Sequence, residues 1–99
     1  MNKTRFENVW DAIEDTPAAA ENMTLRSNGM MALQQYIAGN GFSQTEAAKR
    51  LGVTQPRIAE LMQGKVNLFD LDSLIHMATT AGLHCEFRID VTPSQQRAA

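Results

Sequence analysis

Polar side chains that can hydrogen-bond to DNA bases gather at the start of one short predicted helix. Gln55 and Arg57 stand in its first turn, and Glu60 follows one turn later. A glutamine side chain presents a donor and an acceptor together, which suits adenine, while an arginine can fork onto guanine or hold a phosphate. Pro56 lies between them and offers only apolar contact, for example to a thymine methyl group. These residue types at this spacing predict a helix that meets base edges in the major groove.

Two short helices joined by a fixed turn are predicted to position these side chains. Ser43 and Glu46 form a capping box, in which the Ser43 hydroxyl accepts from the Glu46 amide and the Glu46 carboxylate returns to the Ser43 amide. Gly52 ends the first helix because it tolerates positive φ, and Thr54 caps the second. The inner faces are expected to be Ala47, Ala48 and Leu51, and then Ile58, Leu61 and Met62. An ordinary helical hairpin is the alternative, but caps, small residues and turn glycine at this spacing favour a helix-turn-helix.

Length and composition limit what surrounds this motif. The chain has 99 residues, enough for one compact domain with a modest core. The sequence contains neither a membrane-spanning apolar run nor a charged start leading into an apolar stretch, so we expect a soluble protein that is not exported. The lone Cys85 agrees with a reducing compartment. A cytoplasmic, nucleoid-associated protein is the resulting expectation.

The net charge of −2 is unevenly distributed along the chain. Residues 1–23 hold two basic and five acidic side chains, whereas residues 43–65 hold four basic and two acidic ones. Attraction to phosphate acts locally because salt screens it over about 10 Å. The positive charge of the motif is therefore compatible with DNA binding, despite the acidic segment that precedes it.

The acidic segment, residues 1–23, contains an amphipathic stripe. Phe6, Val9, Trp10 and Ile13 follow one another at helical spacing, which predicts a short helix. Two interpretations stay open, namely packing on the chain's own core or anchoring of a partner protein, because tryptophan is favoured at binding hot spots. Pro17 limits this helix, and residues 16–22 could be helical or loose.

Two further helices complete the predicted DNA-binding domain, residues 24–82. Thr24 can cap a helix from about Leu25 to Ala38, which Asn40 and Gly41 end. Asp70 caps the last helix and Gly82 closes it. The expected inner faces are Leu25, Met30, Leu33, Tyr36 and Ile37 in the first, and Leu71, Leu74, Ile75 and Ala78 in the second.

The period changes to two in residues 83–91, which predicts a β-strand. One face would carry Leu83, Cys85, Phe87, Ile89 and Val91, and the other His84, Glu86, Arg88 and Asp90. No other segment alternates in this way, so we expect a second copy of the chain to supply the partner strand in a homodimer. The alternative is that the strand folds back on the N-terminal segment. Residues 92–99 are expected to be a disordered tail.

The stretch SQTEAAKRLGVTQPRIAELMQGK resembles the XRE family, which includes the lambdoid repressors and Cro. The longer run through LFDLDSLIHMATTAGLHCEFRI resembles the branch of HigA-type antitoxins. The resemblance implies a mainly all-α, five-helix fold like that of lambda repressor. Together with the alternating residues 83–91, the expected fold also has one C-terminal β-strand that pairs across a homodimer. It further implies that Gln44 contacts a phosphate and Gln55 a base, and that these two side chains can brace each other. It also implies phosphate contacts from the segment that follows the base-contacting helix, here Gln63, Lys65 and Asn67. The expected DNA-contacting set is Gln44, Thr54, Gln55, Pro56, Arg57, Glu60, Gln63, Lys65 and Asn67.

Two functions follow as hypotheses from these patterns and from what the resemblance implies. The first is an antitoxin that binds a palindromic operator, represses its own operon and neutralises a basic RelE-like toxin through Phe6, Val9, Trp10 and Ile13. The alternative is a stand-alone XRE-family transcriptional regulator without a toxin partner. We expect no enzymatic activity and no cofactor, because no catalytic constellation is present. His76, His84 and Cys85 do not have the spacing of a closed metal site, so no metal is expected.

Overall fold

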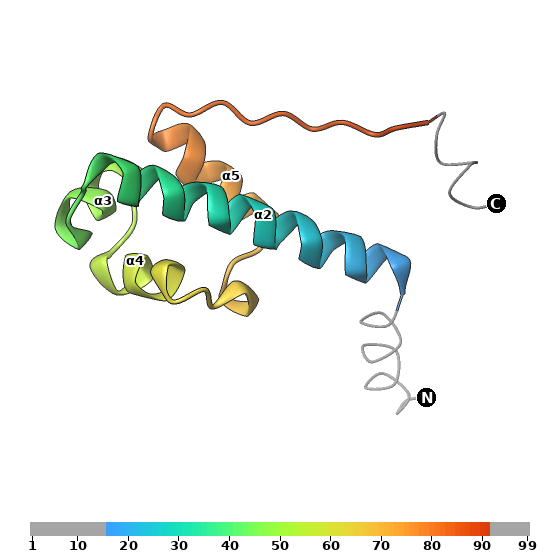
Figure 1. Ribbon diagram of the computed structural model, residues 1–99, viewed down its shortest axis with the longest axis horizontal. Coiled ribbons are helices and arrows are strands. Elements are labelled where there is room, and N and C mark those ends of the chain that lie inside the picture. Colours follow the sequence, from blue (N-terminus) through green and yellow to red (C-terminus); the bar gives the residue numbers. More distant parts are fainter. Residues whose placement is uncertain (1–15, 92–99) are drawn as a thin grey trace.

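The protein is described by a computed structural model over residues 16–91, and this part of the chain is helical (Figure 1). Its α-helices are α2 (Pro17–Asn40), α3 (Gln44–Leu51), α4 (Gln55–Met62) and α5 (Leu71–Thr80), and a 3-10 turn, η1 (Val66–Leu68), precedes α5. The predicted helix that would carry Phe6, Val9, Trp10 and Ile13 lies outside the described residues, so the fifth helix is not shown. The predicted tail, residues 92–99, also lies outside them.

Helix α2 begins earlier than the sequence pattern indicated. Thr16 is its N-cap, with the hydroxyl oxygen accepting from the Ala19 amide at 3.1 Å, and Pro17 occupies the first turn. The predicted cap, Thr24, lies inside the helix, and the helix is continuous across the domain boundary expected at residue 23. The alanine-rich segment has a high helix propensity, and a good cap extends that preference to Thr16. The helix continues to Asn40, past the expected last residue Ala38, and Gly41 ends it as predicted, at φ 68°.

The core lies between the second half of α2 and the three shorter helices. The first half of α2 extends beyond the body in Figure 1, and the buried positions of this helix are Met30, Leu33 and Ile37. The other buried core side chains come from α3, α4, α5 and the segment before α5: Ala47, Ala48, Leu51, Ile58, Leu61, Phe69, Leu74, Met77 and Ala78. The predicted inner faces of α2, α3 and α4 are thus confirmed at most positions.

Three expected core positions are instead exposed. Leu25 in α2 and Met62 at the end of α4 are each 38% exposed. Ile75 is 47% exposed, while Met77, which the pattern had not selected, is buried. The inner stripe of α5 follows Leu74, Met77 and Ala78, and a residue one position after Leu74 is turned by about 100° away from that stripe.

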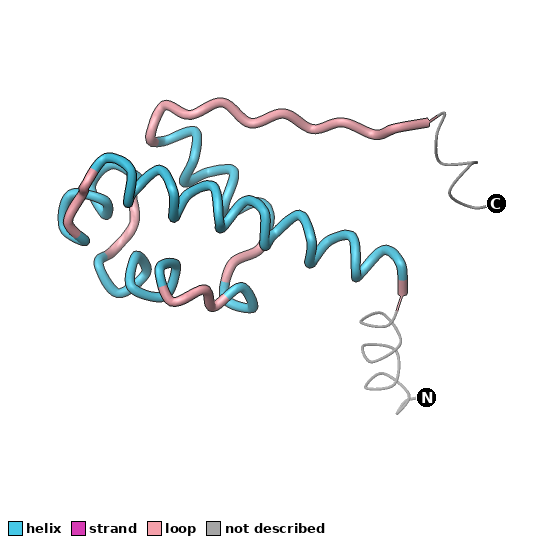
Figure 2. The backbone as a smooth tube through the Cα atoms, viewed as in Figure 1, coloured by secondary structure: helices cyan, strands magenta, loops and turns pink. Residues whose placement is uncertain are grey.

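Residues 83–91 form an extended segment, and no strand is present within residues 16–91 (Figure 2). Leu83 packs partly against the core and its amide donates to the Ala78 carbonyl at 2.9 Å, while Phe87 is 81% exposed. A strand requires a neighbour with which to form a hydrogen-bonded ladder, and the described part of this one chain provides no such ladder. Residues 17–23 belong to α2, so this stretch of the N-terminal segment does not supply one. Pairing with a second copy stays a prediction.

Candidate nucleic-acid interface

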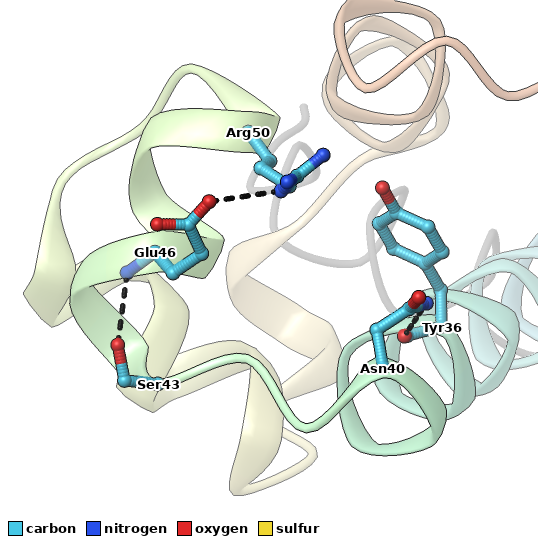
Figure 3. Close-up of polar contacts among 5 residues, drawn as sticks. All are labelled: Tyr36, Asn40, Ser43, Glu46 and Arg50. Carbon is cyan, nitrogen blue, oxygen red and sulfur yellow. Dashed lines mark hydrogen bonds and ion pairs between the residues drawn. The ribbon is translucent and has the colours of Figure 1, made fainter.

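The start of α3 is held by its cap and by the corner that joins it to α2. The Ser43 hydroxyl oxygen accepts from the Glu46 amide at 3.1 Å, as predicted (Figure 3). The Glu46 carboxylate does not return to Ser43 as the capping box requires; it pairs with Arg50 Nε at 3.0 Å. A glutamate and an arginine four residues apart share one helix face, so this ion pair competes with the return bond. Only half of the predicted capping box is therefore formed.

Aromatic packing reinforces the same corner. The rings of Tyr36 and Phe42 meet edge to face, with centroids 5.6 Å apart, and the Arg50 guanidinium lies 4.5 Å from the centre of the Phe42 ring. The Asn40 side-chain amide donates back to the Tyr36 carbonyl at 2.8 Å, which closes the last turn of α2 (Figure 3). These contacts fix α3 against the end of α2.

The turn between α3 and α4 has the predicted geometry. Gly52 adopts φ 73°, in the left-handed region, and its amide donates to the Ala48 carbonyl at 2.9 Å. A Cβ atom at this position would also lie 3.1 Å from Cγ2 of Thr80, so both backbone and space favour glycine. Thr54 then caps α4, its hydroxyl oxygen accepting from the Arg57 amide at 3.4 Å. The direction in which α4 leaves the turn is thereby set.

Gln55, at the first position of α4, is exposed and already oriented. Its Nε2 donates to the hydroxyl oxygen of Thr45 in the first turn of α3, at 2.6 Å. The resemblance had implied that Gln44 and Gln55 can brace each other; in the structure the side chain bonded to Gln55 is Thr45. A carboxamide nitrogen carries two N–H donors and its oxygen accepts, so one bond to Thr45 leaves capacity for a base edge. Thr45 is thus a site residue that the sequence pattern did not identify.

Arg57 is engaged within the protein. Its Nη1 pairs with the Glu60 carboxylate at 3.1 Å, its Nη2 donates to the Leu68 carbonyl at 2.7 Å, and its guanidinium lies 4.2 Å from the centre of the Phe69 ring. The side chain is about one-third exposed. These contacts tie α4 to η1 and to the buried Phe69. Sequence spacing could not reveal them, because Leu68 and Phe69 lie beyond the end of α4.

The end of α4 is held from α2. The Gln34 side chain donates to the Leu61 carbonyl at 2.8 Å, and Arg26 Nη1 donates to the Phe69 carbonyl at 3.5 Å. The Leu61 carbonyl belongs to the last turn of α4, where carbonyls have no partner within the helix. Gln34 therefore fixes the point at which the chain turns into the segment predicted to contact phosphates.

The remaining predicted contact residues lie around this framework. Gln44, Thr54, Pro56, Gln63, Lys65 and Asn67 are all exposed, and Glu60 is half-buried beside Arg57. Arg50 and Arg57 each form an ion pair with a glutamate of their own helix. The net positive charge of the motif accordingly comes from Lys49 and Lys65, both of which are exposed. The partner-binding set Phe6, Val9, Trp10 and Ile13 lies outside the described residues.

Asp70 shows how charge supports the last helix. Its carboxylate accepts from the Ser73 amide at 2.8 Å and forms the N-cap of α5. Hydrogen bonds from Ser73, and to a smaller extent the nearby Arg26, lower the pKa of the Asp70 carboxyl below its usual value. Within the described part of the chain, no group of three or more His, Cys, Asp or Glu side chains is arranged to hold a metal ion.

Comparison with known families agrees with this geometry. Residues 12–90, most of the chain, match the helix-turn-helix domain. No curated protein matches the sequence. None of the helices in residues 16–91 is both long and apolar enough to cross a membrane. The chain belongs to the helix-turn-helix domain family, whose members bind DNA.

Proposed function

We propose that this protein is a sequence-specific transcriptional repressor that places α4 in the major groove of a palindromic operator. The observation that supports this best is the bond from Gln55 to Thr45. A base-contacting side chain that is held before binding loses less rotamer freedom on the DNA, which favours both affinity and selectivity. Gln55 is therefore the residue that we expect to discriminate bases most strongly.

The other side chains divide into base and phosphate contacts. Pro56 is exposed beside Gln55 and offers a thymine methyl an apolar surface. Gln44, Gln63, Lys65 and Asn67 are exposed around the helix pair, where the DNA backbone would pass when α4 enters the groove. Arg57 would have to leave the Leu68 carbonyl and the Phe69 ring to reach a base. We infer that Arg57 chiefly holds α4 in place, with Glu60 as its partner.

The proposal is tested by selecting preferred duplexes from a random pool with the wild-type chain. Gln55→Ala should then lose about 1 to 3 kcal/mol on the selected duplex and little on a scrambled one. Lys65→Ala should weaken both duplexes alike and reduce the salt dependence of binding, because it removes a phosphate contact. Thr45→Ala, which frees the Gln55 side chain, should weaken the selected duplex by about 1 kcal/mol. Equal losses of Gln55→Ala on both duplexes would refute base recognition by this residue.

The finer proposal is that the protein is the antitoxin of a type II toxin–antitoxin pair. Two considerations support it: the resemblance to HigA-type antitoxins, and the acidic character of residues 1–23. A RelE-like toxin acts on RNA and needs a positive surface, which an acidic segment complements. Under this hypothesis Phe6, Val9, Trp10 and Ile13 anchor the toxin. The alternative is a stand-alone XRE-family regulator.

The extent of α2 indicates where the chain should be cut to separate these functions. Removal of residues 1–15 keeps the Thr16 cap, whereas a chain that starts at Met23 would lose the first turns of α2. The shortened protein should still bind its duplex but fail to inhibit a co-encoded toxin. Trp10→Ala in the full chain is the matched point variant, with thermal unfolding measured in parallel. Unchanged inhibition by the shortened protein would refute the anchoring role of the N-terminal segment. The absence of a neighbouring small toxin gene would favour the stand-alone regulator.

A further inference from the structure

The extended segment after α5 separates its side chains into two faces. His84 and Glu86 approach within 3.5 Å, and Arg88 and Asp90 within 3.2 Å, so these alternate residues point to the same side. The intervening Cys85, Phe87 and Ile89 belong to the other side and are exposed. The segment thus has one apolar and one charged face, as a strand at an interface would.

When a second copy of this segment runs antiparallel to the first, its acidic positions can lie opposite the basic positions of the first copy. If two copies run antiparallel with Phe87 facing Phe87, each Glu86 faces the oppositely charged Arg88 of the second copy, and each His84, a hydrogen-bonding imidazole, faces its Asp90 carboxylate. On the apolar side, Cys85 faces Ile89. Opposite charges directly across an antiparallel pair are stabilising, and like charges are destabilising.

We propose that residues 84–90 of two copies pair as antiparallel strands in the register centred on Phe87. The proposal deepens the dimer on which recognition of a palindromic operator rests. Leu83 stays partly packed on its own core, which places the ribbon directly beyond α5. A twofold axis through Phe87 relates the two copies of α4, as a palindromic site requires.

Neighbouring arrangements place like charges together. A register centred on Glu86 puts Glu86 against Glu86 and His84 against Arg88. A register centred on Arg88 puts Arg88 against Arg88 and Glu86 against Asp90. A shift by a single residue moves the apolar face of one copy against the charged face of the other. Parallel in-register pairing brings each charge beside its own copy.

The register also determines where cysteines can cross-link. Residue 87 faces itself, with Cα atoms about 4.5 to 5.5 Å apart, within the range of a disulfide. Cys85 and its copy lie four residues apart along the ribbon, about 13 Å, beyond that range. The single native cysteine should therefore not cross-link the dimer, although it lies in the interface.

The test uses the full chain carrying Cys85→Ser as the background. Phe87→Cys in this background should form an interchain disulfide under mild oxidation. Ile89→Cys, the matched control, should cross-link at least tenfold less, because residue 89 faces residue 85. Ile89→Cys with the native Cys85 retained should cross-link again. Efficient cross-linking of Ile89→Cys in the Cys85→Ser background, or none of Phe87→Cys, would overturn the register.

Charge reversal provides a second measurement with the apolar face intact. Arg88→Glu should raise the dimer dissociation constant at least tenfold in sedimentation, since two glutamates then face each other. Combining it with Glu86→Arg should restore dimerisation to within threefold. Failure of the double variant to recover would overturn the pairing. Binding to a single half-site duplex is measured alongside: a monomeric Arg88→Glu chain that keeps its base preference shows that the strand pairing, and not DNA recognition, governs assembly.

Discussion

Arg57→Ala should lower the stability of the isolated protein, even though Arg57 lies in the predicted DNA-contacting set. The guanidinium over Phe69 contributes about 1 kcal/mol, because the site is only partly desolvated. The charged hydrogen bond to the Leu68 carbonyl adds about 1 kcal/mol after allowance for its exposure. The pair with Glu60, three residues away on one helix, adds roughly 0.3 kcal/mol. Together the contacts predict a loss of about 2 kcal/mol.

Arg50→Ala is the matched control. Arg50 also pairs with a glutamate of its own helix and lies over an aromatic ring, Phe42. Among the described residues, however, only Arg57 of these two arginines adds a hydrogen bond to a distant carbonyl. The loss for Arg50→Ala should therefore be about 1 kcal/mol.

Urea unfolding of the free proteins, followed by circular dichroism, measures both variants. The slope with denaturant should stay constant, since neither change alters the surface exposed on unfolding appreciably. Equal losses for Arg57→Ala and Arg50→Ala would refute the contribution of the Leu68 bond. If Arg57→Ala lowers the free energy of unfolding by less than about 0.5 kcal/mol and also removes the base preference, Arg57 contacts a base and does not chiefly hold α4 in place.

Further outcomes concern the turn and the last helix. Gly52→Ala should destabilise the protein by about 1 to 3 kcal/mol, because a left-handed backbone is strained for alanine and its Cβ would crowd Thr80. Gly39→Ala, inside α2 with open space around it, should stabilise by about 0.5 to 1 kcal/mol, as measured for both variants by urea unfolding. The lowered pKa of Asp70 means that its contribution to stability is present at neutral pH and is lost as the pH falls through the folded pKa. Asp70→Asn keeps a capping side chain, so its unfolding temperature should depend less on pH below about 4 than that of the wild type.

The sequence alone determined the motif that carries the candidate interface. Ser43 and Gly52 mark the two ends of α3 correctly, and Thr54 marks the start of α4, because a cap or a left-handed glycine acts on amides and carbonyls within about four residues. Such signals are contained in a short window of residue types. The cap at Thr16 is also a local feature of the sequence. The alanine-rich residues that follow it lack apolar periodicity, however, so the sequence pattern did not show that α2 begins there.

Only the tertiary structure decided how the side chains of the motif are used. Thr45 holds Gln55, the Leu68 carbonyl and the Phe69 ring hold Arg57, and none of these partners follows from helical spacing. Which face of α5 is buried was likewise decided by packing: Leu74, Met77 and Ala78 meet the core, and Ile75 is exposed. A helical pattern specifies which residues share a face, but the packing of one helix on another specifies what that face meets. The partners of long polar side chains such as Gln55 and Arg57 are set by this packing, because the atoms that they contact belong to residues outside their own helix.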